Sequence, residues 1–163
     1  MKTFVNGVTV MNNPSADNGI ARANIEIIIE FFSLYLKDKE RFYSLWVDRN
    51  PEVITPFVTD DVAVLQRGVH AGWPAVKKFW DPIHDEMQGR FDWFIDDIIP
   101  GEDPNVIVTR SHSEVDVHAG PTWGNRSVKY TGRYVQIFRF IDGRVKSFEE
   151  YYDTACLNEA YGS

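Results

Sequence analysis

The chain has 163 residues and a net charge of −7 at pH 7, so it has the length of one domain with one hydrophobic core. This acidic balance, without any stripe of Lys and Arg to neutralise phosphates, argues against a nucleic-acid partner. Aromatic residues make up 14% of the chain, which favours a sheet and a concave apolar pocket over an all-helical domain.

The sequence also lacks the features of several other protein classes. Cys156 is the single cysteine, which excludes a disulfide within the chain, and no His and Cys residues have metal-ligand spacing. Because there is no Gly-rich nucleotide loop either, we expect neither a metal nor another cofactor. No apolar run has the length of a signal peptide or a membrane span. We therefore expect a cytoplasmic protein without membrane contact, in which residues 1–18 form a flexible polar arm and residues 19–163 form a single domain.

Helices are predicted in the first part of the domain. Apolar residues recur every three or four positions between residues 20 and 35, with Asp17 or Asn18 as the N-cap. A shorter helix is predicted over Lys39–Val47, which ends before Pro51 because the residue preceding a proline avoids the α conformation.

Residues 62–65 (VAVL) are predicted to form the first strand. We interpret Asp60 and Asp61 as closing the turn before this strand rather than as a catalytic pair. Residues 68–72 are predicted to form a turn. A third helix begins at Trp73, because the proline that follows fits a first helical turn. One face of this helix carries Val76, Phe79, Trp80, Ile83 and Met87.

Strand signals dominate the second part of the domain. Strands are predicted over residues 91–99, 106–117 and 128–140, and a final strand ends in EEYYD at residues 149–153. An Asp-Gly turn at residues 141–144 joins the last two strands into a hairpin. Helices followed by antiparallel strands indicate an α+β fold, in which helices cap a curved sheet to form a cone.

The C-terminal sequence FRFIDGRVKSFEEYYD and the segment Trp93–Asn105 (WFIDDIIPGEDPN) resemble the SnoaL-like branch of the nuclear transport factor 2 (NTF2)/ketosteroid isomerase superfamily. The resemblance spans roughly residues 20–160 and is closest to the phenazine biosynthesis A/B proteins and to limonene epoxide hydrolase. It implies a cone-shaped NTF2-like fold, with a curved, mainly antiparallel mixed sheet packed against three to four N-terminal helices. It also implies a homodimer that binds a small-molecule substrate.

Glu150 is the first candidate for a catalytic residue. Alternate side chains of a strand share a face, so Phe148, Glu150 and Tyr152 point together, away from Glu149 and Tyr151. A carboxylate between rings on a buried face has a raised pKa, which suits a general acid or base. The resemblance places the acid of both relatives at Glu150, and the alternative is a solvated or ion-paired carboxylate at the edge of the sheet.

Arg110, His112 and Tyr130 are the other candidates for catalytic roles. The resemblance places Arg110 and His112 inside the cone, where His112 can move protons and Arg110 can orient a carboxylate. It also places a pocket tyrosine at Tyr130, which can donate to a substrate oxygen. The alternatives are a structural hydrogen bond for His112 and core packing for Tyr130. The second carboxylate of the epoxide hydrolase is replaced by His112, so its pair of carboxylates is not reproduced.

Six further residues are candidates for the substrate-binding lining. They are Trp80, His84, Trp93, Tyr134, Phe148 and Tyr152. Core packing is the alternative for the two tryptophans. For His84, which precedes two acidic residues near a helix end, the alternative is an exposed side chain.

The functional hypothesis is a small cofactor-free enzyme in secondary metabolism. It would perform acid/base chemistry on an apolar oxygenated metabolite, such as isomerisation, cyclisation, dehydration or condensation. The alternatives are an epoxide hydrolase of the limonene epoxide hydrolase type and a non-catalytic module that binds a ligand or a partner. A homodimer is expected through the outer face of the penultimate strand, which mixes charged and apolar side chains. That face carries Lys129, Thr131, Arg133, Val135, Ile137 and Arg139.

Overall fold

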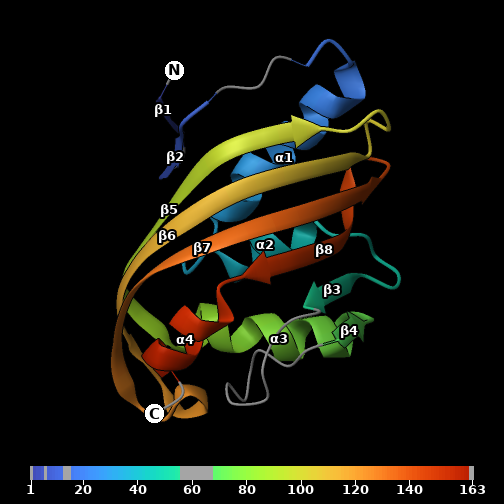
Figure 1. The fold of residues 1–163 in the computed structure, drawn as a ribbon. Coiled ribbons are helices and arrows are strands. Elements are labelled where there is room, and N and C mark those ends of the chain that lie inside the picture. The colour runs from blue at the N-terminus through green and yellow to red at the C-terminus, as the bar shows by residue number, and fades with distance from the viewer. Residues whose placement is uncertain (1, 6, 13–15, 56–67, 162–163) are drawn as a thin grey trace.

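The computed structural model describes residues 2–5, 7–12, 16–55 and 68–161. Over these residues the chain is a mixed α+β fold with four α-helices and one curved eight-stranded sheet that does not close (Figure 1). The predicted fold class is confirmed. No helix of the described ranges is both long and apolar enough to cross a membrane.

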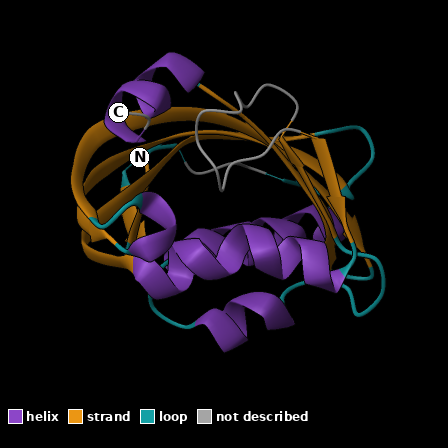
Figure 2. Cartoon of the chain, turned by 90° about the horizontal axis from the view of Figure 1, so that it is seen from below, coloured by secondary structure: helices purple, strands orange, loops and turns teal. Residues whose placement is uncertain are grey.

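The sheet has the strand order β1-β2-β5-β6-β7-β8-β3-β4. The strands are β1 (Thr3–Val5), β2 (Val8–Val10), β3 (Glu52–Thr55), β4 (Gly68–Ala71), β5 (Met87–Pro100), β6 (Val106–Ala119), β7 (Arg126–Ile141) and β8 (Arg144–Tyr152). Most pairs are antiparallel, whereas β2 with β5 and β3 with β8 are parallel. The long strands β5 to β8 form the wall of the cone and curve around the helices (Figure 2).

The helices are α1 (Gly19–Ser33), α2 (Lys39–Ser44), α3 (Trp73–Glu86) and α4 (Thr154–Tyr161). Asn18 caps α1, since its side chain accepts hydrogen bonds from the backbone of Ile20 and Ala21. The second helix is shorter than predicted. After Ser44 the chain pairs with β8 instead, through a parallel bridge between Trp46 and Val145.

The core lies between α1 and the concave face of the sheet. Phe31 of α1 is fully buried, and its ring lies 5.1 Å from that of Phe138 on β7 and 5.2 Å from that of Phe148 on β8. Phe32 stacks on Trp93 of β5 with ring centroids 4.9 Å apart. The abundant aromatic residues therefore fill the cone where helix and sheet meet.

The predicted C-terminal hairpin is confirmed. Its two turn residues, Asp142 and Gly143, both have positive φ angles, 50° and 75°, as a two-residue hairpin turn of the type I′ class requires. The turn pairs Ile141 with Arg144, and a bulge between Arg139 and Phe140 then shifts the register by one residue, so that Gln136 lies opposite Glu150.

The N-terminal residues differ from the prediction of a flexible arm. Strand β2 pairs in parallel with β5, and Val8 and Val10 are buried in the core. The expectation is wrong for these residues because a three-residue apolar strand gains its stability from an existing strand edge rather than from its own length. Such pairing leaves little periodicity in the sequence.

Three other elements, β3, β4 and α4, were missed, and two predicted features lie outside the described residues. The strand predicted over residues 62–65 and the Asp60–Asp61 turn are outside them. Residues 68–71 form a strand instead of a turn, because they pair antiparallel with β3, which was not predicted. Helix α4 was also missed, although Leu157 and Tyr161 lie four positions apart and are both buried, as one helix face requires.

Candidate active site

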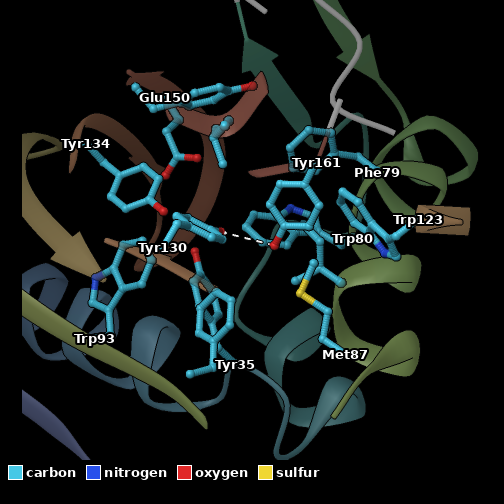
Figure 3. A pocket seen from close by; sticks show the side chains of 14 residues that line it. Tyr35, Phe79, Trp80, Met87, Trp93, Trp123, Tyr130, Tyr134, Glu150 and Tyr161 are labelled. Atoms are coloured by element: carbon cyan, nitrogen blue, oxygen red, sulfur yellow. Dashed lines mark hydrogen bonds between the residues drawn. The ribbon is translucent and has the colours of Figure 1, made fainter. Parts of the chain in front are cut away.

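A cavity of about 50 Å³ lies in the cone between the concave face of β5 to β8 and the helices α3 and α4 (Figure 3). It is lined by Tyr35, Phe79, Trp80, Ile83, Met87, Phe91, Trp93, Trp123, Tyr130, Tyr134, Glu150, Tyr152, Leu157 and Tyr161. Among these described residues, Glu150 is the one carboxylate, and there is no Lys, Arg or His. The lining is otherwise aromatic and aliphatic, with tyrosine hydroxyls as its polar groups.

Glu150 points from β8 into this cavity, toward the rings of Tyr130 and Tyr134 (Figure 3). Burial raises the pKa of its carboxyl group from 4.5 to about 7, and a hydrogen bond from Gln136 lowers the pKa in part. Glu149 lies on the opposite face, where its carboxylate accepts a hydrogen bond from Tyr151 at 3.1 Å. Glu150 therefore lies on the cavity side of β8, opposite Glu149, and burial is the physical cause of its raised pKa.

The tyrosine hydroxyls around Glu150 are hydrogen-bond donors. Tyr134 pairs with Ser113 on β6 at 2.8 Å, and Tyr161 donates to Tyr130 at 3.3 Å. Burial raises the pKa of Tyr35, Tyr130 and Tyr134 above the ordinary value, and the nearby Glu150 carboxylate raises each further. These hydroxyls stay protonated at neutral pH and can donate to a substrate oxygen.

Arg110 and His112 do not reach the cavity, so the expectation that they point into the cone is wrong. Both lie on the outer face of the sheet. Arg110 pairs with Asp97 of β5 at 2.6 Å, with 62% of its side chain exposed. His112 bonds to Asp96 at 2.8 Å, and its ring stacks on Phe94 at 4.5 Å. His112 therefore makes a structural hydrogen bond, which was the alternative to a catalytic role.

The inner face of β6 belongs to the odd-numbered residues instead. Thr109, Ser111 and Ser113 are buried there, between Ile107 and Val115. An error of one residue in the facing of a strand exchanges its inner and outer side chains.

His84 and Phe148 belong to the core rather than to the cavity lining. His84 packs on Phe42 with ring centroids 4.5 Å apart, and burial lowers the pKa of its imidazole to about 4. It is neither exposed nor in the described lining. Phe148 is fully buried, and its ring stacks on that of Phe31 in the core. Of the six binding candidates, Trp80, Trp93, Tyr134 and Tyr152 do line the cavity.

Three polar residues of the site were not among the candidates from the sequence. Gln136 donates to Glu150, Tyr35 enters the cavity from the end of the first helical segment, and Tyr161 enters it from α4 (Figure 3). For Gln136 a signal was available, since it is the polar position within the inward series of β7 that includes Tyr134 and Phe138. Tyr161 had no such signal, because its helix was not predicted.

No group of three or more His, Cys, Asp or Glu residues with metal-binding geometry occurs in the part of the chain described here. Independence from metals and other cofactors remains a prediction.

Residues 40–148, more than half of the chain, match the SnoaL-like domain family. The chain belongs to this family. The predicted resemblance to the SnoaL-like branch is confirmed. The antiparallel strands and the aromatic cavity described above belong to this SnoaL-like protein. A search of curated proteins gave no significant match.

Solved structures share this SnoaL-like fold. A phenazine biosynthesis-related protein from Pseudomonas aeruginosa is 15% identical, with a TM-score of 0.71 over 92% of this chain and 88% of that one. A protein assigned as a SnoaL-like polyketide cyclase from Jannaschia sp. CCS1 is 13% identical, with a TM-score of 0.71 over 92% and 99%. SalBIII, an epoxide hydrolase/cyclase-like enzyme in pyran ring formation in polyether salinomycin, is 14% identical, with a TM-score of 0.62 over 83% and 94%. At such identities the likeness shows the fold alone. The specific likeness to limonene epoxide hydrolase stays a prediction.

Proposed function

We propose that this protein is a cofactor-free enzyme that performs acid/base chemistry on an apolar, oxygenated metabolite, with Glu150 as its proton-transferring residue. One observation carries the proposal. A carboxyl group with a pKa of about 7 projects into a cavity of aromatic rings and protonated tyrosine hydroxyls. A catalytic acid or base works best when its pKa lies near the working pH.

The proposed mechanism has two proton transfers. Ionised Glu150 removes a proton from a carbon next to a carbonyl, and the negative charge moves onto the carbonyl oxygen. A hydroxyl of Tyr130 or Tyr35 donates a hydrogen bond to that oxygen as its charge develops. Glu150 then returns the proton to another carbon, which gives an isomer. Alternatively, the enolate carbon attacks a second carbonyl carbon of the same molecule, whose C=O π bond breaks as the ring closes, and Glu150 gives its proton to the resulting alkoxide.

The lining favours an uncharged substrate. Its described residues offer rings for stacking and hydroxyls for hydrogen bonding but no cation to neutralise a phosphate or carboxylate. The hydroxyl of Tyr152 is buried without a hydrogen-bond partner among the described residues, so a substrate oxygen can satisfy it. The proposed substrate is therefore a neutral ketone, enol or phenol with extended apolar surface.

The size of the cavity requires a rearrangement when such a substrate binds. About 50 Å³ suffices for ordered water, whereas ligand pockets measure roughly 300–1,000 Å³. Helix α4 covers one side through Leu157 and Tyr161, and Tyr161 packs on Trp123 of the 3₁₀ helix Pro121–Trp123 at 5.0 Å. Displacement of α4 is the simplest route to a larger pocket.

Shortening Leu157 to Ala is expected to increase the affinity of an uncharged apolar dye, such as Nile red, several-fold, because it removes a side chain from the cavity lining. Fluorescence titration measures the affinity. Glu159→Ala, on the exposed face of the same helix, is the control and should leave dye binding unchanged. Equal affinities for both variants and the wild type would show that α4 does not limit access.

The two other functions have different degrees of support. A binding module that performs no chemistry is consistent with the small aromatic cavity, and it predicts a bound metabolite that is released unchanged. An epoxide hydrolase with paired carboxylates has less support, because the described lining holds Glu150 alone. Incubation with a panel of neutral polycyclic ketones and epoxides, followed by mass spectrometry and NMR of the products, separates these cases.

We also propose a homodimer through the outer face of β6 to β8. This face holds a groove of about 730 Å³ that includes Arg133, Val135 and Tyr151, and Val135 is 39% exposed. Charged groups mixed with exposed apolar area are typical of a partner-facing surface.

Sedimentation is expected to give twice the chain mass for the wild type. Val135→Arg, which adds charge to this face, should shift the equilibrium toward the monomer at micromolar concentration. Lys2→Ala, at an exposed position away from the groove, is the control. A wild-type monomer at every concentration contradicts the proposed dimer.

A further inference from the structure

Three polar side chains cross the apolar inner face of the sheet beside Glu150. Thr109 and Gln136 are fully buried and Ser111 is 2% exposed. Burying a hydroxyl or an amide is costly unless every polar atom has a hydrogen-bond partner. These residues satisfy one another, and the chain of hydrogen bonds ends on Glu150.

The bonds in this chain have a single direction. The hydroxyls of Thr109 and Ser111 donate to Oε1 of Gln136 at 2.6 and 2.7 Å, and Nε2 of Gln136 donates to Oε2 of Glu150 at 2.9 Å. A carboxylate accepts hydrogen bonds but has none to donate, so the reversed amide would place its oxygen against the carboxylate. The two hydroxyls occupy both acceptor sites of the amide oxygen when the N–H group faces Glu150.

Strand register places these groups in line. Thr109 on β6 lies opposite Gln136 on β7, and Gln136 lies opposite Glu150 on β8. The backbone pairing of three strands therefore fixes the positions of the amide and the carboxylate, so neither side chain depends on a loop.

We propose that Gln136 is a positioning residue for Glu150, held by Thr109 and Ser111 so that its N–H group stabilises the ionised carboxylate and leaves Oε1 of Glu150 free to face the cavity. This inference rests on the proposed function for its catalytic meaning, whereas its structural content concerns the carboxylate alone. A charge-assisted hydrogen bond of this kind partly offsets the desolvation of a half-buried carboxylate such as that of Glu150.

The other titratable groups facing Glu150 are hydroxyls. Tyr35 follows α1, Tyr130 and Tyr134 lie on β7, Tyr152 lies on β8 and Tyr161 lies on α4. In the described lining no charged side chain accompanies them. Among the described residues, Gln136 is therefore the group that stabilises the ionised form of Glu150 directly, through its hydrogen bond.

Titration of Glu150 by NMR, with ¹³C-labelled glutamate, tests the inference without a substrate. Gln136→Met keeps the volume of the side chain and removes the N–H donor, so the pKa of Glu150 should rise by about one to two units. The double variant Thr109→Val with Ser111→Ala keeps the amide but frees its orientation, and a smaller rise is expected. Ser113→Ala, on the same strand face but bonded to Tyr134, is the control and should leave the pKa nearly unchanged.

An unchanged pKa in both Gln136→Met and the double variant overturns the inference. If Gln136→Met does not fold, the double variant alone decides. An unchanged pKa of Glu150 in the double variant then overturns the inference. Once a substrate is known, the pH–rate profile of each variant should move by the same amount as its NMR titration. A pKa that moves while the rate profile does not contradicts the catalytic role of Glu150 and leaves the positioning role of Gln136 intact.

Discussion

Replacing Glu150 with Gln is expected to lower the turnover rate about 10²–10⁴-fold, the usual contribution of a residue that transfers a proton. The variant keeps the size and shape of the side chain but has no ionisable group. Steady-state kinetics on a substrate found by the screen measure the effect. Glu149→Gln removes a carboxylate from the opposite face of the same strand and should leave turnover nearly unchanged.

The same variant has an expected effect on stability. A carboxyl group whose pKa is raised on folding holds more protons in the folded than in the unfolded protein between the two pKa values. The free energy of unfolding of the wild type therefore falls as pH rises from about 4.5 to above 7. Glu150→Gln removes this loss, so it should be at least as stable as the wild type at pH 8. A variant that is much less stable at pH 8 would indicate a structural role for the carboxylate.

Shortening Phe31 to Ala is expected to lower the free energy of unfolding by about 3–5 kcal/mol, the usual cost of removing a buried aromatic ring. The ring is fully buried, and it contacts the rings of Phe42, Phe138 and Phe148 within 5.2 Å. Its removal leaves a cavity where the first helix meets the sheet.

Urea unfolding followed by circular dichroism measures this effect. Ile20→Ala, on the same helix but 53% exposed, is the control and should change the free energy of unfolding by less than about 0.5 kcal/mol. A loss below about 1 kcal/mol for Phe31→Ala would show that the aromatic cluster does not hold helix and sheet together.

The hairpin and the facing of Glu150 were predictable because local rules determine them. The Asp-Gly turn joins the two strands, and alternation within residues 148–152 places Glu150 on the face of Phe148 and Tyr152. Counting from the turn alone would have placed Glu150 on the opposite face, because a bulge shifts the register between Arg139 and Phe140. The apolar partners Phe148 and Tyr152 marked the inner face.

The facing of β6 was not predictable in the same way. Its inner residues Thr109, Ser111 and Ser113 are polar because they support Gln136 and Tyr134, so the middle of the strand has no apolar alternation. The resemblance instead placed Arg110 and His112 inside. A hydrogen-bonded network inside a core removes the hydrophobic signal from which a face is assigned.

The short elements β2, β3 and α4 depend on contacts distant in sequence. Strand β2 is stabilised by the edge of β5, and α4 by packing of Leu157 and Tyr161 over the cavity. Few residues are involved in each, so sequence periodicity is weak. The cap over the site was therefore visible only in three dimensions.

Titration of Glu150 in the wild-type protein is the sharpest test of its proposed role in proton transfer. In ¹³C NMR of protein with labelled glutamate, the side-chain carboxyl signal of Glu150 is assigned by its absence from Glu150→Gln. A midpoint at about pH 7 is expected, because burial in the cavity raises the pKa of the carboxyl group. A midpoint near the ordinary value of 4.5 would contradict this role, since that carboxylate would be solvated and ill-suited to exchange protons at neutral pH.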